Sequence, residues 1–207
     1  MQKANHNLKI RRAEPQDATL CTPLIYSAGA ELFDYIYEYA GFSPQDFIKK
    51  EFMQGSGFMG HKLHWVAELN GVVVGVCALY SRRDLMSMNL ATTAHVINMY
   101  GIKSAKPLFR ALNAGSIISV PDKNVLHLAN FGVSAECRSS GIGTHLLNHA
   151  ATIAQQGGFK GVSLDVSVQN PRGQALYERI GFKVVRENIF KDRHSGVPNA
   201  RLMFWAV

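Results

Sequence analysis

Long apolar runs are missing from this sequence of 207 residues. No stretch reaches the roughly 18 consecutive apolar residues that a membrane-spanning helix requires. Residues 1–7 are polar, and the apolar segment of a secretory signal does not follow them. We therefore expect neither a signal peptide nor a membrane partner, and we expect a cytoplasmic location.

Cysteine is scarce, and its three copies, Cys21, Cys77 and Cys137, lie far apart. Their number is odd and their spacing fits no common zinc-ligand pattern, so reduced thiols are the simple interpretation. His145 and His149 stand one helical turn apart, as zinc ligands on helices often do. No third ligand accompanies them, so a solvated helix face explains them better and no metal is expected.

Long basic tracts are also absent, although the formal net charge is +7. Basic residues gather only in pairs, at 11–12, 49–50 and 82–83. Proteins that bind nucleic acid usually carry a basic stripe or a recognisable module, so no nucleic-acid partner is expected. The charge suits an anionic small ligand better.

Helical and strand-like patterns alternate along the chain, and we expect one domain over residues 1–207. Strand-like segments at 63–69 and 72–80 are joined by Asn70 and Gly71, which predicts a hairpin with a type I′ turn. The patterns predict further strands at 9–13, 125–133, 162–168, 183–190 and 201–207, and helices at 15–39, 43–54, 141–156 and 170–180. Hairpin and crossover connections together predict an α/β (α+β) fold with a mixed, helix-covered sheet.

A strand, a tight loop and a helix start follow one another at 125–144. The loop reads RSSGIG over residues 138–143, and its two glycines allow a ligand close to the backbone. The following helix points unpaired N–H groups and the positive end of its dipole at the loop, as a pyrophosphate site requires. The glycines alone fit a plain turn equally well. A Walker A loop is excluded because no Gly-Lys-Ser/Thr follows, and the dinucleotide motif needs a third glycine.

The loop resembles the acetyl-CoA signature of the GNAT superfamily of N-acetyltransferases, Arg/Gln-x-x-Gly-x-Gly/Ala, position for position. A second segment, NPRGQALYERIGF at 170–182, is similar to the family's Asn-x-x-Ala-x-x-x-Tyr-x-x-x-Gly-Phe motif, with the alanine displaced to Ala175. The two motifs cover residues 125–182. The resemblance implies a GNAT-type mixed, mostly antiparallel central sheet flanked by helices, and transfer of an acetyl group from acetyl-CoA to a primary amine.

The resemblance also implies which residues hold acetyl-CoA. Backbone groups near Phe131 and Val133 would pair with the pantetheine arm. Asn170 would contact that arm, and as an N-cap it would also satisfy free N–H groups of the next helix. Backbone N–H groups would bind the pyrophosphate, and they belong to Arg138, Gly141, Ile142, Gly143 and Thr144.

Two catalytic roles follow from the same resemblance. Tyr177 would be the general acid toward the departing thiolate, although its spacing alone would favour a packed aromatic. His127, six residues before Val133, resembles the base glutamate of the histone-acetylating branch and is the first candidate for general base. A strand histidine is more often structural, and Glu68 and Asp165 are weaker candidates.

The acceptor amine stays open: it is a small molecule or an amine of a peptide or protein. The alternative hypothesis is a catalytically silent acyl-CoA-binding or sensor module, and Tyr177 is the feature that favours catalysis.

Residues 84–123 depart from the family, which usually has a short turn between these strands. They predict a helical insert between strands 3 and 4, with helices near 85–100 and 106–115. Its apolar residues cover the sheet, wall the acceptor side of the cleft, or form a subunit contact in a homodimer. We favour the acceptor wall.

Overall fold

The structure is a computed structural model that describes residues 7–207. Residues 1–6, on which the expectation about a signal peptide partly rested, lie outside the described residues. Within the described part, no helix has both the length and the apolar character needed to cross a membrane.

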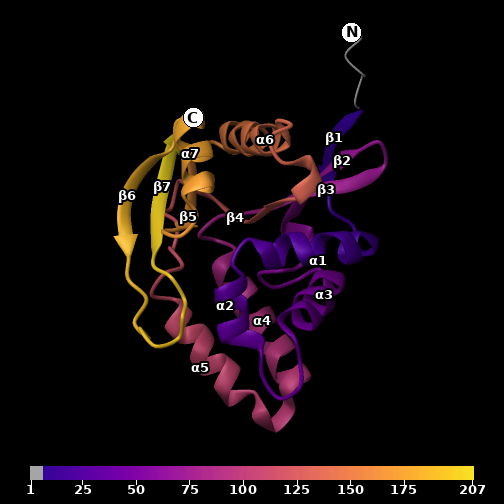
Figure 1. Cartoon of the computed structure of the whole chain (residues 1–207), viewed down its shortest axis with the longest axis vertical. Helices are drawn as coiled ribbons and strands as arrows, with labels where there is room; N and C mark the ends of the chain where they lie inside the picture. The colour runs from indigo at the N-terminus through magenta and orange to yellow at the C-terminus, as the bar shows by residue number, and fades with distance from the viewer. Residues whose placement is uncertain (1–6) are drawn as a thin grey trace.

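Over residues 7–207, seven strands form one sheet in the order β1-β2-β3-β4-β5-β7-β6 (Figure 1). Neighbouring strands are antiparallel except β4 and β5, which are parallel. The predicted mixed, mostly antiparallel sheet is therefore confirmed. The strands are β1 (Leu8–Arg12), β2 (His64–Leu69), β3 (Val72–Tyr80), β4 (Leu126–Val133), β5 (Gly161–Ser167), β6 (Lys183–Asn188) and β7 (Ala200–Ala206).

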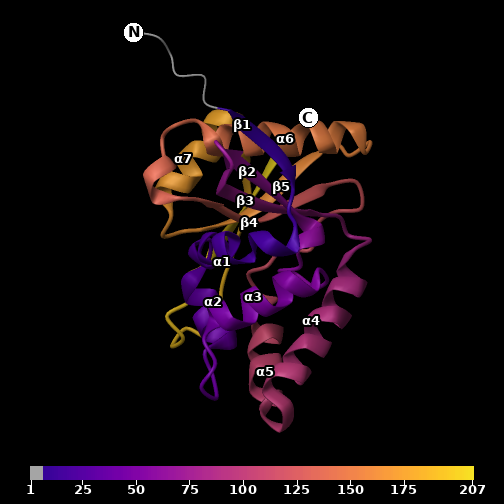
Figure 2. The same cartoon turned by 90° about the vertical axis from the view of Figure 1, so that its right-hand side faces the viewer.

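The helices lie on both faces of the sheet. In Figure 2, α6 and α7 lie above the sheet, and α1 to α5 gather below it. The predicted single helix over 15–39 is wrong, because a 3-10 turn at Pro15–Asp17 precedes two helices that separate at Gly29. The helices are α1 (Ala18–Ser27), α2 (Ala30–Tyr37), α3 (Pro44–Gln54), α4 (Leu85–Tyr100), α5 (Ala105–Ala114), α6 (Ile142–Gln156) and α7 (Pro171–Ile180).

Each face of the sheet has its own hydrophobic core. The alternation of side chains along a strand directs Leu128 of β4 and Leu164 of β5 upward, where they join Leu146 of α6 and Tyr177 of α7. Below the sheet, Val66 of β2 and Val76 of β3 join buried residues of α1 and α3 in the second core. The two cores hold the strands between them as a rigid layer.

The parallel pairing of β4 with β5 is short, and it ends at Leu128 opposite Leu164. Beyond this point β4 stays paired with β3, and β5 with β7. A β-bulge lies here, since Asn130 and Phe131 together face Cys77 of β3. Asn130 has a positive φ of 51°, which asparagine adopts more readily than most residues. The bulge bends β4 away from β5 and opens a gap between them.

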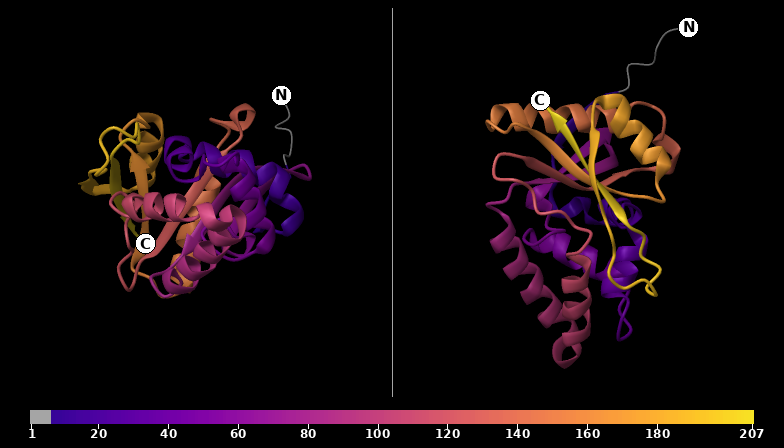
Figure 3. Two further views of the ribbon diagram at one scale, coloured as in Figure 1. Left: turned by 90° about the horizontal axis from the view of Figure 1, so that it is seen from below. Right: turned by 90° about the vertical axis from the view of Figure 1, so that its left-hand side faces the viewer.

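The helical insert is confirmed, with helices at Leu85–Tyr100 and Ala105–Ala114. α4 packs against α3 and α5 against α2, so the insert extends the lower layer (Figure 3). Val96 joins the core below the sheet, whereas Leu90 and Ile102 remain exposed. A homodimer contact through these exposed residues stays a prediction.

Gly132 gives a direct test of how closely β4 packs on α1. A Cβ at this position would lie 2.3 Å from the carbonyl oxygen of Leu24, so Gly132→Ala must displace backbone. We expect it to lower the free energy of unfolding by about 1–3 kcal/mol in a urea titration. Gly115→Ala is the control, because Gly115 has helical backbone angles and should change stability by less than about 1 kcal/mol. Equal effects of the two variants would contradict the packing.

Candidate active site

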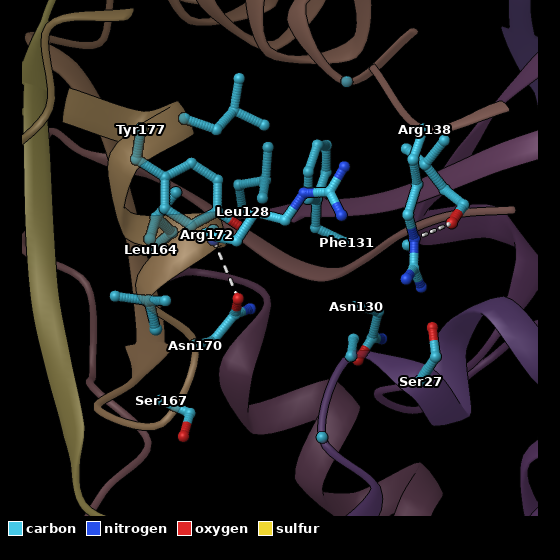
Figure 4. A pocket seen from close by; sticks show the side chains of 18 of the residues that line it. Ser27, Leu128, Asn130, Phe131, Arg138, Leu164, Ser167, Asn170, Arg172 and Tyr177 are labelled. Carbon is cyan, nitrogen blue, oxygen red and sulfur yellow. Dashed lines mark hydrogen bonds between the residues drawn. The ribbon is translucent and has the colours of Figure 1, made fainter. Parts of the chain in front are cut away.

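The gap between β4 and β5 opens into a cavity of about 770 Å³. Figure 4 shows side chains that line it, from strands, helices and loops on both faces of the sheet. The lining comes from five segments: 128–133 of β4, 164–167 of β5, the loop 137–144, the segment 169–179 that includes most of α7, and the α1–α2 connection at 27–31. Nearly all the residues that the two motifs single out therefore meet in one place.

The loop before α6 offers free backbone donors. Gly141 is the N-cap of α6, with φ 90°, and no side chain caps the first turn. The N–H groups of Ile142, Gly143 and Thr144 therefore have no partner within the helix. They lie at the positive end of the helix dipole, where an anion is stabilised.

Arginines add positive charge beside these donors. Arg138 donates from Nε to the carbonyl oxygen of Val133, and Arg172 of α7 donates to Ser139 Oγ at 3.0 Å. Arg179, about two turns after Arg172 in α7, also lines the cavity. Unpartnered N–H groups with cations around them fit the diphosphate of acetyl-CoA.

The residues predicted to hold the pantetheine arm lie along the gap. Phe131 and Val133 line it from the bulged end of β4. Asn170 caps α7, because its Oδ1 accepts a hydrogen bond from the Gly173 N–H at 2.8 Å. The capping role of Asn170 is confirmed, and its contact with acetyl-CoA stays a prediction.

Tyr177 lines the cavity from α7 and is 7% exposed. Its ring packs edge-to-face on Phe131 and on Phe182, with centroids 5.9 and 5.8 Å away. Burial raises the pKa of the Tyr177 hydroxyl, so the group stays protonated near neutral pH. A buried, protonated hydroxyl beside the gap is able to donate a proton there.

His127 lies behind the cavity wall. It is 2% exposed on the face of β4 opposite Leu128, and the lining residues of the described chain do not include it. Its Nδ1 lies 2.9 Å from Ser163 Oγ. Burial lowers the pKa of His127 to about 4, which makes the ring neutral near pH 7. This position does not favour contact with an acceptor, and the role of His127 as general base stays a prediction.

Asp165 of β5, ranked below His127 from the sequence, does line the cavity. Ser119 holds its carboxylate by two hydrogen bonds of 2.7 Å, from the backbone N–H and from Oγ. The His127 Nε2 lies 3.7 Å from Asp165 Oδ2; we do not count this as an ion pair because the imidazole is neutral. Burial raises the pKa of Asp165. The sequence holds a signal for it, since Ser163, Asp165 and Ser167 alternate with apolar residues in a central strand.

One other sequence candidate for the general base, Glu68, lies elsewhere. Glu68 is on β2 and accepts a hydrogen bond from Arg11 Nε at 2.7 Å, away from the cavity lining.

Two parts of the lining were not predicted from the sequence. One is Asn130, whose Nδ2 donates to the Phe58 carbonyl at 3.0 Å and lies 3.1 Å from His64 Nε2. The other is the segment 27–31, which was predicted as the middle of a helix.

The insert does not form the wall that we favoured. Among the described residues that line the cavity, none belongs to 84–123. α4 packs on α3 and α5 packs on α2. The insert contacts a lining residue through Ser119, which holds Asp165.

Comparison with known proteins agrees with the site. The model of the Acetyltransferase (GNAT) family matches residues 29–182, so the chain belongs to this family. The resemblance stated from the two motifs is therefore confirmed. The co-substrate of the family is acetyl-CoA, which is the ligand that the loop fits.

The chain is similar to N-alpha-acetyltransferase 30 of Xenopus laevis, with 33% identity over 38% of this chain and 29% of that protein. It is also similar to N-alpha-acetyltransferase 50 of Danio rerio, with 32% identity over 32% of this chain and 41% of that protein. The chain thus spans less than half the length of these curated relatives.

Solved structures extend the likeness to the whole fold. A crystal structure described as an acetyltransferase aligns with a TM-score of 0.71 at 22% identity, over 96% of this chain and 99% of that one. An N-acetyltransferase from Staphylococcus aureus Mu50 aligns with a TM-score of 0.70 at 17% identity, over 95% and 99%.

We expect Gly143→Glu to abolish acetyl-CoA binding. A Cβ at Gly143 would lie 3.3 Å from both Leu176 and Phe131, and the added carboxylate would repel a phosphate. Titration calorimetry with acetyl-CoA measures the effect, and circular dichroism confirms folding. Gln155→Glu adds the same charge at the exposed far end of α6 and should bind as the parent does. Retained affinity in a folded Gly143→Glu protein would refute the loop assignment.

Proposed function

We propose that this chain transfers the acetyl group of acetyl-CoA to a primary amine by direct attack on the thioester. The observation that supports this most is the cavity between β4 and β5, which brings the anion-binding loop, Tyr177 and Asp165 together. The thioester supplies an acetyl group on a good leaving group. The residues of the chain would bind it, orient it and move two protons.

Binding would divide between the two halves of the gap. The free N–H groups at the start of α6 would hold the diphosphate, with Arg138 and Arg172 beside it. Phe131 and Val133 would hold the pantetheine arm along β4 where β5 has diverged. The acetyl end would then lie in the narrow part of the gap, next to Tyr177.

Asp165 would prepare the acceptor. An amine is protonated near neutral pH, and it must lose a proton before its nitrogen attacks a carbonyl carbon. Asp165 reaches the cavity, and burial moves its pKa upward toward the working range. His127 would act behind it as a neutral neighbour that keeps the pocket closed to water.

Tyr177 would complete the exchange. As the nitrogen–carbon bond forms and the carbon–sulfur bond breaks, the Tyr177 hydroxyl would give its proton to the departing sulfur. The amine nitrogen loses two protons in all. The first passes from Asp165 to solvent, and the second, released from nitrogen after its bond to carbon has formed, would return to Tyr177 and restore its hydroxyl. The net products are an acetylated amine, free CoA and one proton, so atoms and charge balance.

The direct experiment incubates the protein with acetyl-CoA and a panel of primary amines, and follows free thiol. Thiol release that depends on the amine supports the proposal, and Gly143→Glu gives the background rate. Tight binding of acetyl-CoA with no thiol release from any amine would instead support a silent acyl-CoA-binding module.

We expect Tyr177→Phe to lower kcat by roughly 10- to 1000-fold while the affinity for acetyl-CoA changes little. The ring and its packing are kept, and only the proton donor is lost. Tyr100→Phe is the matched control, because its hydroxyl bonds the Tyr37 carbonyl far from the gap. That control should lower stability but not turnover. An unchanged rate in Tyr177→Phe would remove this hydroxyl from the reaction.

We expect Asp165→Asn to lower kcat by roughly 100-fold and to remove the acidic limb of the pH profile of kcat. The sign follows from the role: a base works when ionised, and burial raises its pKa, so parent activity falls as pH falls through that raised pKa. Ser119→Ala keeps the carboxylate and one of its two hydrogen bonds, so it should retain the acidic limb. An identical pH profile in Asp165→Asn would assign the base elsewhere.

A further inference from the structure

The two sides of the cavity carry opposite charge. On the side of α6 and α7, the charged lining residues are Arg138, Arg172 and Arg179. On the side of α1 and α2, the charged lining residues are Glu31, at the start of α2, and Asp165, on the lower face of β5. The upper side matches the phosphates of acetyl-CoA, which leaves the lower side for the acceptor.

Neutral polar groups and small residues fill the rest of the lower side. Ser27 and the segment 28–30 come from the α1–α2 connection, and Ser167 comes from β5 below the gap. No lysine or arginine of α1, α2 or β5 is among the described residues that line the cavity. Burial has the larger effect on the pKa of Asp165 and raises it; the charge of Arg186 on β6 reaches Asp165 and lowers its pKa, but Arg186 is not among the described lining residues. An acceptor with a carboxylate next to its amine would therefore meet Asp165 or Glu31 with no lining cation beside them.

The acidic character continues outward along α2. Glu31 and Asp34 are three residues apart and share one face of the helix, and Glu38 follows as its C-cap. They surround Tyr26, whose hydroxyl donates to Asp34 Oδ1 at 2.9 Å. That hydrogen bond and the burial of Tyr26 raise its pKa, and the charges of all three carboxylates add to the effect.

These carboxylates have no cationic partner in the described chain. No nitrogen of lysine, arginine or histidine among residues 7–207 lies within ion-pair distance of Glu31, Asp34 or Glu38. Arg110 stacks over the Tyr35 ring and donates to the Glu38 backbone carbonyl instead of to a carboxylate. A negative potential therefore remains at the lower mouth of the cavity, in a protein of net charge +7.

We propose that the acceptor is an alkyl di- or polyamine, whose reacting amine lies at Asp165 while a second ammonium group lies at Glu31. This inference rests on the proposed acetyl transfer and names its acceptor class. The second ammonium group would be stabilised by the negative charge of Glu31. The reacting amine would then remain next to Asp165, which accepts its proton. Free amino acids are selected against, because their carboxylate adds a third negative charge to the same side.

The test compares 1,4-diaminobutane with butylamine, which has the same chain and one amine fewer. For the parent protein we expect kcat/KM at least 10-fold higher for the diamine, mostly through KM. Glu31→Gln should remove this preference by raising the KM of the diamine and leaving butylamine unchanged. Glu187→Gln is the control, because it removes one negative charge on β6 where Glu187 pairs with Arg201.

Binding gives a second readout that does not depend on turnover. Calorimetry with 1,4-diaminobutane on the CoA-saturated protein should show about 10-fold weaker binding for Glu31→Gln than for the parent.

Equal kcat/KM for the two amines in the parent would overturn the diamine assignment, while thiol release from both would still support acetyl transfer. A lysine-rich peptide that exceeds the diamine in kcat/KM would overturn it too. Diamine binding that depends on Glu31 without any thiol release would keep the acceptor class and overturn the transfer reaction.

Discussion

The divergence of β4 from β5 is the constraint on which the candidate site depends. Hydrogen bonding between the two strands stops at Leu128 and Leu164, and the bulge at Asn130 bends β4 toward β3. A continuous parallel pair would leave no gap, and the loop, Tyr177 and Asp165 would then have no common space. The same bulge sends Phe131 upward onto Tyr177 and leaves Asn130 facing the lower layer. One extra residue in one strand thus sets the geometry of both sides of the cavity.

The bulge is held from below by a chain of buried polar contacts. Asn130 donates to the Phe58 carbonyl, and the neighbouring Met59 N–H donates to the fully buried carboxylate of Glu51. His95 of α4 contacts the same carboxylate at 2.9 Å. A buried carboxylate is costly unless its hydrogen bonds are made, so these contacts fix the turn between α3 and β2. The insert therefore supports the site from a distance, although it does not line the cavity.

The sequence predicts well those features that depend only on residues adjacent in the chain. The Asn70-Gly71 turn, the cap by Asn170 and the glycine loop at 138–143 are local features, and all three are present. Features that depend on long-range pairing were missed. Whether His127 or Asp165 faces the cavity depends on where β4 and β5 diverge, which no local pattern reveals. Ser119 is 46 residues from Asp165, whose carboxylate it holds. The break at Gly29 was hidden because the apolar pattern continues through it.

Burial explains how one cavity would hold both the proposed acid, Tyr177, and the proposed base, Asp165. It disfavours the charged form of any group, so it raises the pKa of Tyr177 and that of Asp165 alike. The ordinary pKa of tyrosine lies several units above that of aspartate, so an upward shift of the pKa has opposite consequences for the two groups near neutral pH. It keeps the tyrosine protonated, as a proton donor must be, and it brings the carboxylate closer to the pH at which it accepts protons efficiently. His127, which is 2% exposed behind the cavity wall, has its pKa lowered by burial and becomes neutral. Burial, more than any one charged neighbour, is thus the largest cause of the pKa shift in all three groups.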